Sequence, residues 1–248
     1  MKKLMIAFVA VFTILPSLVF ASGGSVHLDK ANYDLSDKAS LQTGAKLFVN
    51  YCLACHSTGY QRYGRVASDL GIPEQLMKEN LIFTDSKIGD LMHNSMDKKE
   101  AAKWFGGTPP DLTLVARVRG ADWIYTYLRS FYVDEERPFG VNNVVFPEVG
   151  MPHVLEELQG ISTPTYEVIT DENGVEHKTV VALTSDESAE MSSDEYDEAV
   201  LNLVNFLVYA GEPNKLEREG MGVWVLAFLF VLFIVSYLLK KEYWRDIH

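Results

Sequence analysis

Apolar residues recur at intervals of three and four positions in two parts of the chain, which predicts two amphipathic helices. The first covers residues 40–51 and contains Gly44 within its apolar face; the second covers residues 194–210. Ser192 and Glu195 form the capping-box signature of a helix start just before the second stretch. Because a glycine lets another backbone approach closely, we expect the two helices to cross at Gly44 as a packed pair.

Residues 161–193 show a different pattern, with two extended runs rich in β-branched residues. The runs flank Asp171-Glu172-Asn173-Gly174, and Asn-Gly between such runs is typical of a β-hairpin turn. From Glu167 to Glu198 there are eleven acidic residues and Lys178 as the sole lysine or arginine. This acidic insertion is interpreted either as a surface that steers a basic partner or as a solvated segment without such a role.

The N-terminus has the three-part layout of a secretory signal peptide. Lys2 and Lys3 precede an apolar run that ends at Phe20-Ala21, so residues 1–21 are predicted to be cleaved. An uncleaved N-terminal anchor is the alternative, although Pro16 interrupts the run. Cleavage would change the formal net charge from -12 to -14, because two lysines are removed.

The other apolar run, residues 221–239, contains 19 residues without a charge. As a helix it would extend about 28 Å, which is close to the thickness of a bilayer hydrocarbon core. Lys240, Lys241 and Arg245 follow the run, and acidic residues predominate before it. By the positive-inside rule, we expect an exported domain over residues 22–220, a transmembrane anchor over 221–239 and a cytoplasmic tail over 240–248.

The two cysteines of the chain lie in Cys52-Leu53-Ala54-Cys55-His56. Such a motif attaches a c-type haem, with each thiol bonded to the ring and the histidine bound to the iron. A redox dithiol is the competing interpretation, but the α/β pattern expected around such a dithiol is not evident. The sequence therefore predicts one haem c, attached through Cys52 and Cys55 and ligated by His56.

The sixth iron ligand separates an electron carrier from a protein that binds gases or substrates at the iron. Met151 is favoured because Pro152 after it disfavours helix, which suits an extended loop over the haem. His153 is the nearest rival, and Met77 and Met92 lie in stretches that look helical and suit a core role. The remaining candidates are His93, Met96 and Met191.

Several segments resemble the cytochrome c1 family, the haem subunit of the quinol:cytochrome c oxidoreductase (bc1 complex). These segments are residues 44–51, Pro109-Pro110-Asp111-Leu112, Phe146-Pro147 through Gly150-Met151-Pro152, and Glu212-Pro213 with Arg218 and Met221-Gly222. They occur in the order of the family and cover nearly the whole mature chain. The resemblance implies a mainly α fold, namely a class I cytochrome c-like haem domain with a β-hairpin insertion and a C-terminal transmembrane helix.

The resemblance also implies roles for single residues. Met151 corresponds to the axial methionine, and a His/Met pair raises the potential of a c-type haem. Arg119 corresponds to the arginine that pairs with a haem propionate. Because metal-bound imidazoles are usually oriented by a hydrogen-bond acceptor, we further expect a carbonyl of Pro109-Pro110, assigned to Pro110, to accept the Nδ1 proton of His56.

The function that follows is a redox subunit of an oxidoreductase, with quinone chemistry on other subunits. Expected partners are cytochrome b, the Rieske iron-sulfur subunit as donor, a soluble or tethered cytochrome c as acceptor, and membrane lipid, whereas nucleic acid is not expected. The expected location is a bacterial inner membrane, with the haem domain on the periplasmic side. A stand-alone membrane-anchored c-type cytochrome that feeds another oxidase or reductase is the alternative.

Overall fold

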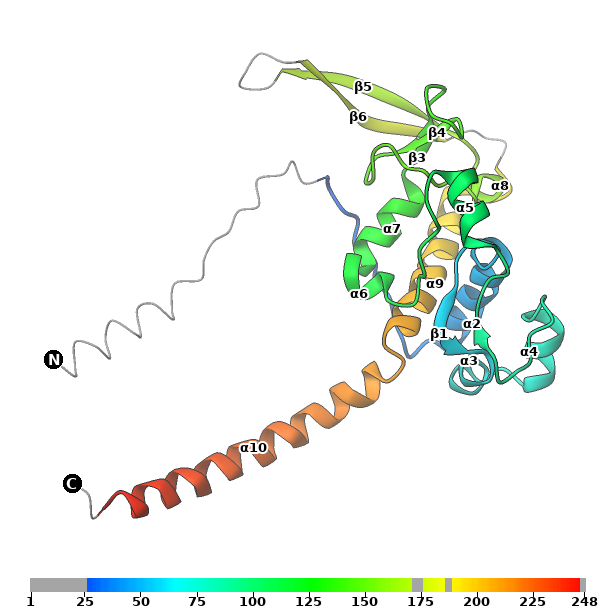
Figure 1. Ribbon diagram of the computed structural model, residues 1–248. Coiled ribbons are helices and arrows are strands. Elements are labelled where there is room, and N and C mark those ends of the chain that lie inside the picture. Colours follow the sequence, from blue (N-terminus) through cyan, green and yellow to red (C-terminus); the bar gives the residue numbers. More distant parts are fainter. Residues whose placement is uncertain (1–25, 171–175, 186–188, 246–248) are drawn as a thin grey trace.

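The computed structural model describes residues 26–170, 176–185 and 189–245. Within these ranges the fold is mainly helical, and each of its small sheets has two antiparallel strands (Figure 1). The helices are α2 (Lys38–Leu47), the π-helical turn η1 (Phe48–Cys52), α3 (Tyr63–Leu70), α4 (Glu74–Asn80), α5 (Lys98–Phe105), α6 (Val115–Arg119), α7 (Ala121–Arg129), α8 (Glu156–Gln159), α9 (Ser193–Gly211) and α10 (Lys215–Tyr243). The strands are β1 (Thr58–Arg62), β2 (Leu91–Met92), β3 (Phe131–Val133), β4 (Val141–Asn143), β5 (Ser162–Thr170) and β6 (Glu176–Ser185). The predicted signal peptide lies outside the described residues.

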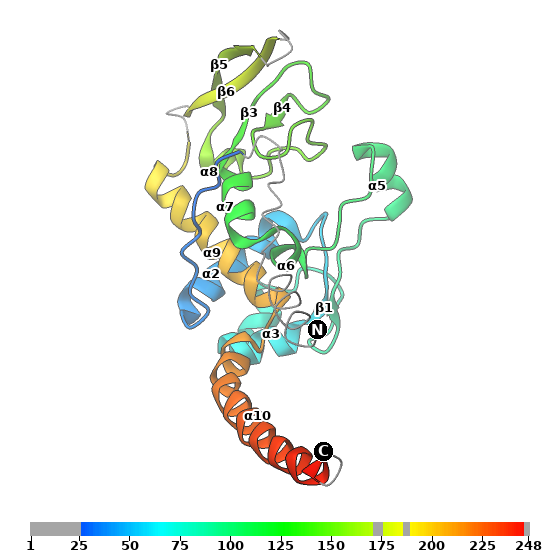
Figure 2. The same cartoon turned by 90° about the vertical axis from the view of Figure 1, so that its left-hand side faces the viewer.

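Helices α2 and α9 cross in the centre of the core, as predicted (Figure 2). A Cβ atom at Gly44 would lie 2.0 Å from the carbonyl oxygen of Asn202, so a larger residue cannot occupy the crossing point. The Phe48 and Phe206 rings meet beside it, with centroids 5.4 Å apart. The predicted capping box at Ser192 and Glu195 is present at the start of α9.

The helix leading into the cysteine motif differs from the prediction. It is α-helical only to Leu47, and Phe48–Cys52 form a wider π-helical turn. The amide of Leu53 donates to the carbonyl of Phe48 at 2.9 Å, which closes this turn. A π-helical turn contains an extra residue per turn, so it changes the direction in which the following side chains point.

The predicted hairpin is confirmed by the antiparallel pairing of β5 with β6 from Ser162–Ser185 to Thr170–Glu176. Its predicted Asn-Gly turn lies outside the described residues. In both views the hairpin projects from the end of the domain opposite to α10 (Figures 1 and 2). Several of its side chains are exposed, among them Tyr166, Val168 and Val181.

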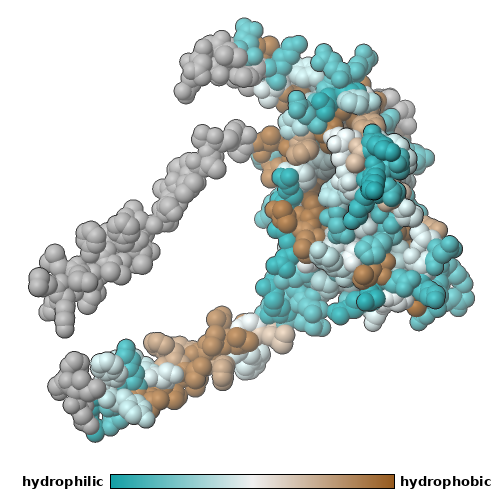
Figure 3. All heavy atoms as spheres, in the orientation of Figure 1, coloured by the Kyte–Doolittle hydropathy of each residue, from teal (hydrophilic) through white to brown (hydrophobic). Residues whose placement is uncertain are grey.

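Helix α10 is long and apolar enough to cross a membrane. None of its residues is buried against the domain, and its hydrophobic surface covers the middle of the helix (Figure 3). The helix extends beyond the apolar run of residues 221–239 at both ends. This geometry agrees with the predicted anchor.

Three residues, 212–214, connect α9 to α10, and polar contacts hold this junction against the domain. The ammonium group of Lys215 donates to the hydroxyl of Tyr33 at 2.6 Å and lies 4.9 Å from the centre of its ring. A guanidinium nitrogen of Arg65 donates to Oδ1 of Asn214 at 2.9 Å. The start of α10 is therefore fixed to two separate parts of the domain.

Candidate haem site

A cavity of about 270 Å³ opens between α7, α9, the cysteine motif and the loop before α8. Its walls are mainly apolar. All six predicted site residues line it, namely Cys52, Cys55, His56, Pro110, Arg119 and Met151. The other lining residues are Tyr51, Leu112, Val115, Trp123, Ile124, Tyr127, Leu128, Phe146, Val149, Gly150, Val154, Leu203 and Leu207. The structure thus brings together residues separated by up to about a hundred positions in the sequence.

Both cysteine thiols are free and stand at the wall of this cavity. Burial raises the pKa of Cys52 to about 12 and also raises the pKa of Cys55. The amides of Cys55 and His56 both donate to the carbonyl of Cys52, at 3.0 and 2.8 Å, so the motif forms a tight turn. In this turn the two protonated thiols and the imidazole are held at one wall.

The imidazole of His56 has a defined orientation. Its Nδ1 lies 2.7 Å from the carbonyl oxygen of Pro110, the acceptor that the sequence analysis expected. A carbonyl can only accept, so Nδ1 carries the proton and Nε2 keeps a free lone pair. Burial lowers the pKa of His56, which favours this neutral form. A neutral imidazole with a free Nε2 is suited to bind a metal ion.

Asp111 places the Pro110 carbonyl by joining two segments of chain. Its Oδ2 accepts from the amide of Gly59 at 2.7 Å, and its Oδ1 accepts from the amide of Thr113 at 2.8 Å. The amide of Leu112 also donates to the carbonyl of Ser57 at 2.8 Å. A Cβ at Gly59 would lie 2.9 Å from Oδ2 of Asp111, so a larger residue would disturb this contact.

Met151 lies on a loop that two asparagines of β4 fasten. Oδ1 of Asn143 accepts from the amides of Val145 and Phe146, at 2.9 and 3.1 Å. Oδ1 of Asn142 accepts from the amide of Glu148 at 2.8 Å. Glu148 itself has φ of 61°, a left-handed conformation that is uncommon for a residue with a side chain. The loop that presents Met151 is therefore held in one conformation by buried polar groups.

Tyr127 from α7 contacts Met151 directly. Its hydroxyl donates to the sulfur of Met151 at 3.4 Å. The Tyr127 ring stacks on Trp123, with centroids 4.9 Å apart, and meets the edge of Phe131 at 5.1 Å. Trp123 and Tyr127 line the cavity, and Phe131 packs against Tyr127 without lining it.

Arg119 places a positive charge at the edge of the cavity. The central carbon of its guanidinium lies 5.0 Å from the centre of the Trp123 ring and 5.9 Å from that of Phe146. Among the described residues no carboxylate forms an ion pair with Arg119. Its charge is thus available to an acidic group at the mouth of the cavity.

The rival sixth ligands lie elsewhere. His153 is buried and stacks on Phe131, with ring centroids 4.7 Å apart, and it is not among the residues that line the cavity. Burial lowers its pKa to about 4. Met77 and Met92 are fully buried in the main core, and the prediction that Met92 lies in a helix is wrong, because it forms β2 with Leu91. His93 and Met96 line another hollow, and Met191 lines a third.

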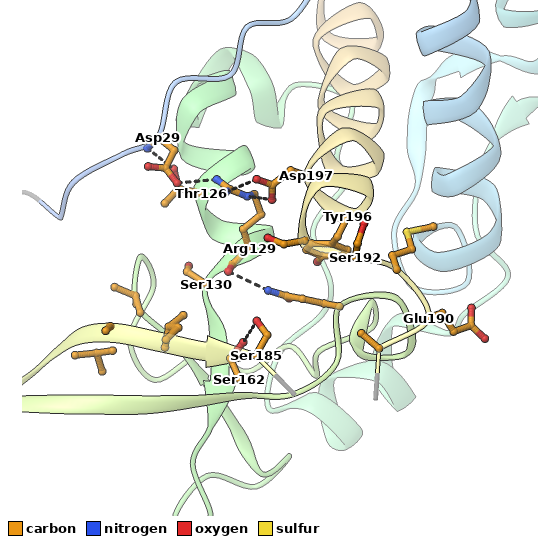
Figure 4. A pocket seen from close by; sticks show the side chains of 18 of the residues that line it. Asp29, Thr126, Arg129, Ser130, Ser162, Ser185, Glu190, Ser192, Tyr196 and Asp197 are labelled. Atoms are coloured by element: carbon orange, nitrogen blue, oxygen red, sulfur yellow. Dashed lines mark hydrogen bonds and ion pairs between the residues drawn. The ribbon is translucent and has the colours of Figure 1, made fainter. Parts of the chain in front are cut away.

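The third hollow, of about 670 Å³, is larger than the cavity described above and lies at the base of the β5–β6 hairpin (Figure 4). The guanidinium of Arg129 spans it, with nitrogens 2.6 Å from Asp29 and 2.5 Å from Asp197. The hydroxyl groups of Ser162 and Ser185 face each other at 3.4 Å. None of the predicted haem-site residues lines this hollow.

The donor set of the smaller cavity fits a covalently attached haem. It offers two thiols, an imidazole with a free Nε2, a thioether sulfur and a guanidinium, around walls that are otherwise apolar. Thiols can form the covalent links, the imidazole and the thioether are ligands of haem iron, and a guanidinium pairs with a carboxylate such as a propionate.

Sequence reasoning missed Tyr127, Asn142 and Asn143 as parts of this site. Tyr127 belongs to an apolar stripe with Ile124 and Leu128 on α7, and helical periodicity over residues 121–129 could have revealed it. The asparagines have no such signal, because their role depends on the backbone of a distant loop.

A mainly helical domain with this cavity and a long apolar C-terminal helix has the features of a membrane-anchored c-type cytochrome. The chain belongs to the cytochrome c1 family, whose model matches residues 29–247.

Three relatives show the range of similarity. Cytochrome c1 of Allochromatium vinosum is 53% identical over 248 residues, the full length of both chains. A protein of Nitrosomonas europaea that bears the name ammonia monooxygenase gamma subunit is 48% identical over 233 residues, 94% of each chain. Cytochrome c1 of Rhodospirillum rubrum is 27% identical over 266 residues, covering 92% of this chain and 91% of its own. The family points to a haem electron-transfer subunit of the bc1 complex.

Proposed function

We propose that this chain carries one haem c, attached through Cys52 and Cys55 and ligated by His56 and Met151, and that it transfers single electrons within a quinol:cytochrome c oxidoreductase. The observation that carries the proposal is the convergence of both thiols, the imidazole and the thioether on one apolar cavity. The family of the chain supports the same conclusion.

Bound haem would supply reversible one-electron chemistry at its iron. The residues of the chain set the conditions for it. Pro110 fixes the tautomer of His56, so that Nε2 keeps the lone pair that would bind the iron. The apolar walls exclude water, and Arg119 offers a partner for a propionate at the cavity edge. Ligation by both His56 and Met151 would leave the iron no open position, which suits electron transfer rather than substrate binding.

Covalent attachment is tested by heme staining of the full-length chain after denaturing electrophoresis. We expect stain at the mass of the wild-type chain. Cys52→Ser and Cys55→Ser should each weaken the stain, and the double variant should abolish it, whereas Ser57→Ala, just after the motif, should keep it. A stained double variant would contradict attachment through these thiols.

Ligation by Met151 is tested by absorption spectra of the ferric protein. A methionine-ligated ferric haem has a characteristic far-red charge-transfer band, which we expect in the wild type and expect to be lost in Met151→His. The matched control is Met96→His, because Met96 lines a different hollow. Cyanide or carbon monoxide that binds the wild-type haem readily at moderate concentration would argue against a closed iron.

For the place in the complex, we infer the Rieske iron-sulfur subunit as the electron donor and cytochrome c as the acceptor. Purification through a tag on this chain should yield cytochrome b and the Rieske subunit, and quinol should reduce the haem rapidly. Recovery of the chain without both subunits would favour the alternative, a stand-alone membrane cytochrome that feeds another oxidase or reductase. The relative from Nitrosomonas bears the name ammonia monooxygenase gamma subunit. Recovery of an oxygenase with the tagged chain would therefore favour a role in an oxygenase complex.

We also infer that the signal peptide of residues 1–21 is removed, and that residues 22–220 lie on the periplasmic side of a bacterial inner membrane. The long apolar helix supports a single-pass anchor. N-terminal sequencing should begin at Ser22. Protease added to the periplasmic side of intact spheroplasts should digest the haem domain but spare a tag on the C-terminus.

A further inference from the structure

We infer that Tyr127 is a positioning residue that tunes the reduction potential of the haem through a hydrogen bond to the sulfur of Met151. The inference rests on the proposed ligation of iron by Met151.

The hydroxyl of Tyr127 and the sulfur of Met151 are 3.4 Å apart, within the range of a hydrogen bond to sulfur. A thioether sulfur has two lone pairs, so it can bind iron with one and accept a hydrogen bond with the other. The two functions of the sulfur are therefore compatible.

The hydroxyl is in a suitable state to donate. A phenol has one O–H donor, and the hydroxyl of Tyr127 is partly buried beside Met151. In the described part of the chain its only hydrogen-bond partner is the Met151 sulfur. A buried hydroxyl without a partner is costly, which favours the contact with Met151 over an unpaired position.

The ring of Tyr127 is held on two sides. Trp123 stacks on it and Phe131 meets its edge, while His153 stacks on the far side of Phe131 at 4.7 Å. A hydrogen bond to its backbone also holds the residue: Nδ2 of Asn143 donates to the carbonyl oxygen of Tyr127 at 2.8 Å. Asn143 also binds the loop that carries Met151, so one side chain sets the positions of both the donor and the acceptor.

A hydrogen bond to the sulfur draws electron density from the thioether. The weaker electron donation destabilises ferric iron more than it destabilises ferrous iron. The hydrogen bond therefore raises the reduction potential. Hydrogen bonding around an axial ligand is a recognised means by which proteins set haem potentials. Loss of the hydroxyl should therefore lower the potential of this haem.

The test is Tyr127→Phe in the full chain, purified with its complex, with Tyr125→Phe as the matched control. Tyr125 lies on the same helix, but its ring faces the guanidinium of Arg129, 4.5 Å away, and it does not line the cavity. We expect Tyr127→Phe to keep the far-red methionine band. The ratio of oxidised to reduced haem at a fixed ambient potential should rise about threefold, a fall of roughly 30 mV at 59 mV per tenfold change. Tyr125→Phe should match the wild type.

A double-mutant cycle separates action through Met151 from a general effect of cavity polarity. In a Met151→His background, Tyr127→Phe should produce no further change in potential. An equal change in both backgrounds, or an unchanged potential in the single variant with its methionine band intact, would overturn the inference. Absence of the band from the wild type would instead overturn the proposed Met151 ligation, so the two failures are distinguishable.

Discussion

The carbonyl oxygen of Pro110 accepts a hydrogen bond from Nδ1 of His56 at 2.7 Å, although the residues are 54 positions apart. The bond leaves Nε2 of His56, a residue that lines the cavity, with a free lone pair. Its geometry depends on Asp111, whose carboxylate joins the Pro110 segment to Gly59. The orientation of the proposed iron ligand thus depends on a side chain that does not itself line the cavity.

Asp111→Ala should therefore disturb both stability and haem ligation. Two backbone amides lose their acceptor, so we expect a loss of about 1–2 kcal/mol in the free energy of unfolding. A higher haem reduction potential should accompany it, because an imidazole that loses its hydrogen bond to Pro110 is a weaker donor to ferric iron. Denaturant titration and redox titration measure the two effects. Asp85→Ala, at an exposed aspartate, is the control and should change neither.

Gly44→Ala should destabilise the fold through the crossing of α2 and α9. The added methyl group would lie 2.0 Å from the Asn202 carbonyl, so the helices must separate. Overpacking of this kind costs about 1–3 kcal/mol, and the backbone contact favours the upper end. Thermal unfolding of the purified protein measures it. Gly89→Ala has open space around its Cβ and should leave the melting temperature unchanged; equal melting of the two variants would contradict the crossing.

The acidic hairpin gives a prediction about the electron acceptor. If Glu167 and Glu176, which are exposed, help to steer a basic cytochrome c, their joint change to Gln should slow association roughly twofold to fivefold at low salt. The difference should vanish at high salt, because exposed charges are then screened. Glu74→Gln with Glu79→Gln removes the same charge from α4 and serves as the control. Stopped-flow rates that do not depend on ionic strength would favour the solvated-segment interpretation.

Membrane insertion can be tested with a charge in the middle of α10. Phe230→Lys places an ammonium group near the centre of the apolar run, where insertion costs about 3 kcal/mol. We expect more of this variant in the alkaline-extractable fraction of membranes. Leu216→Lys lies in the same helix before the apolar run and should stay in the membrane pellet like the wild type. Full retention of both variants would argue against a spanning role.

Local sequence patterns predicted much of the fold. The capping box at Ser192, the close approach at Gly44 and the β5–β6 pairing were all expected, and all are present. Each depends on residues near one another in sequence or on a residue type with one strong physical role. The Pro110 acceptor was also expected, because metal-bound imidazoles have a general need for such a partner.

Other features could not be derived in this way. The π-helical turn at Phe48–Cys52 interrupts a stretch whose apolar spacing suits a regular helix, and Met92 lies in a two-residue strand whose partner is Thr58. The hydrogen bond from Tyr127 to Met151 joins segments that are distant in sequence, and so does the bond from Asn143 to Tyr127. These segments meet through the packing of α7 and β4. Tertiary contacts determine these features, and the spacing of apolar residues along the sequence does not predict them.

The fixed junction between α9 and α10 has a consequence for how electrons reach and leave this protein. The connector has three residues and is held by the hydrogen bonds from Lys215 to Tyr33 and from Arg65 to Asn214, so it is a short and restrained linker rather than a flexible one. These contacts restrict rotation of the domain about the start of α10. In the proposed electron pathway we therefore expect the donor and the acceptor to move to and from this protein, which relays electrons from a fixed position.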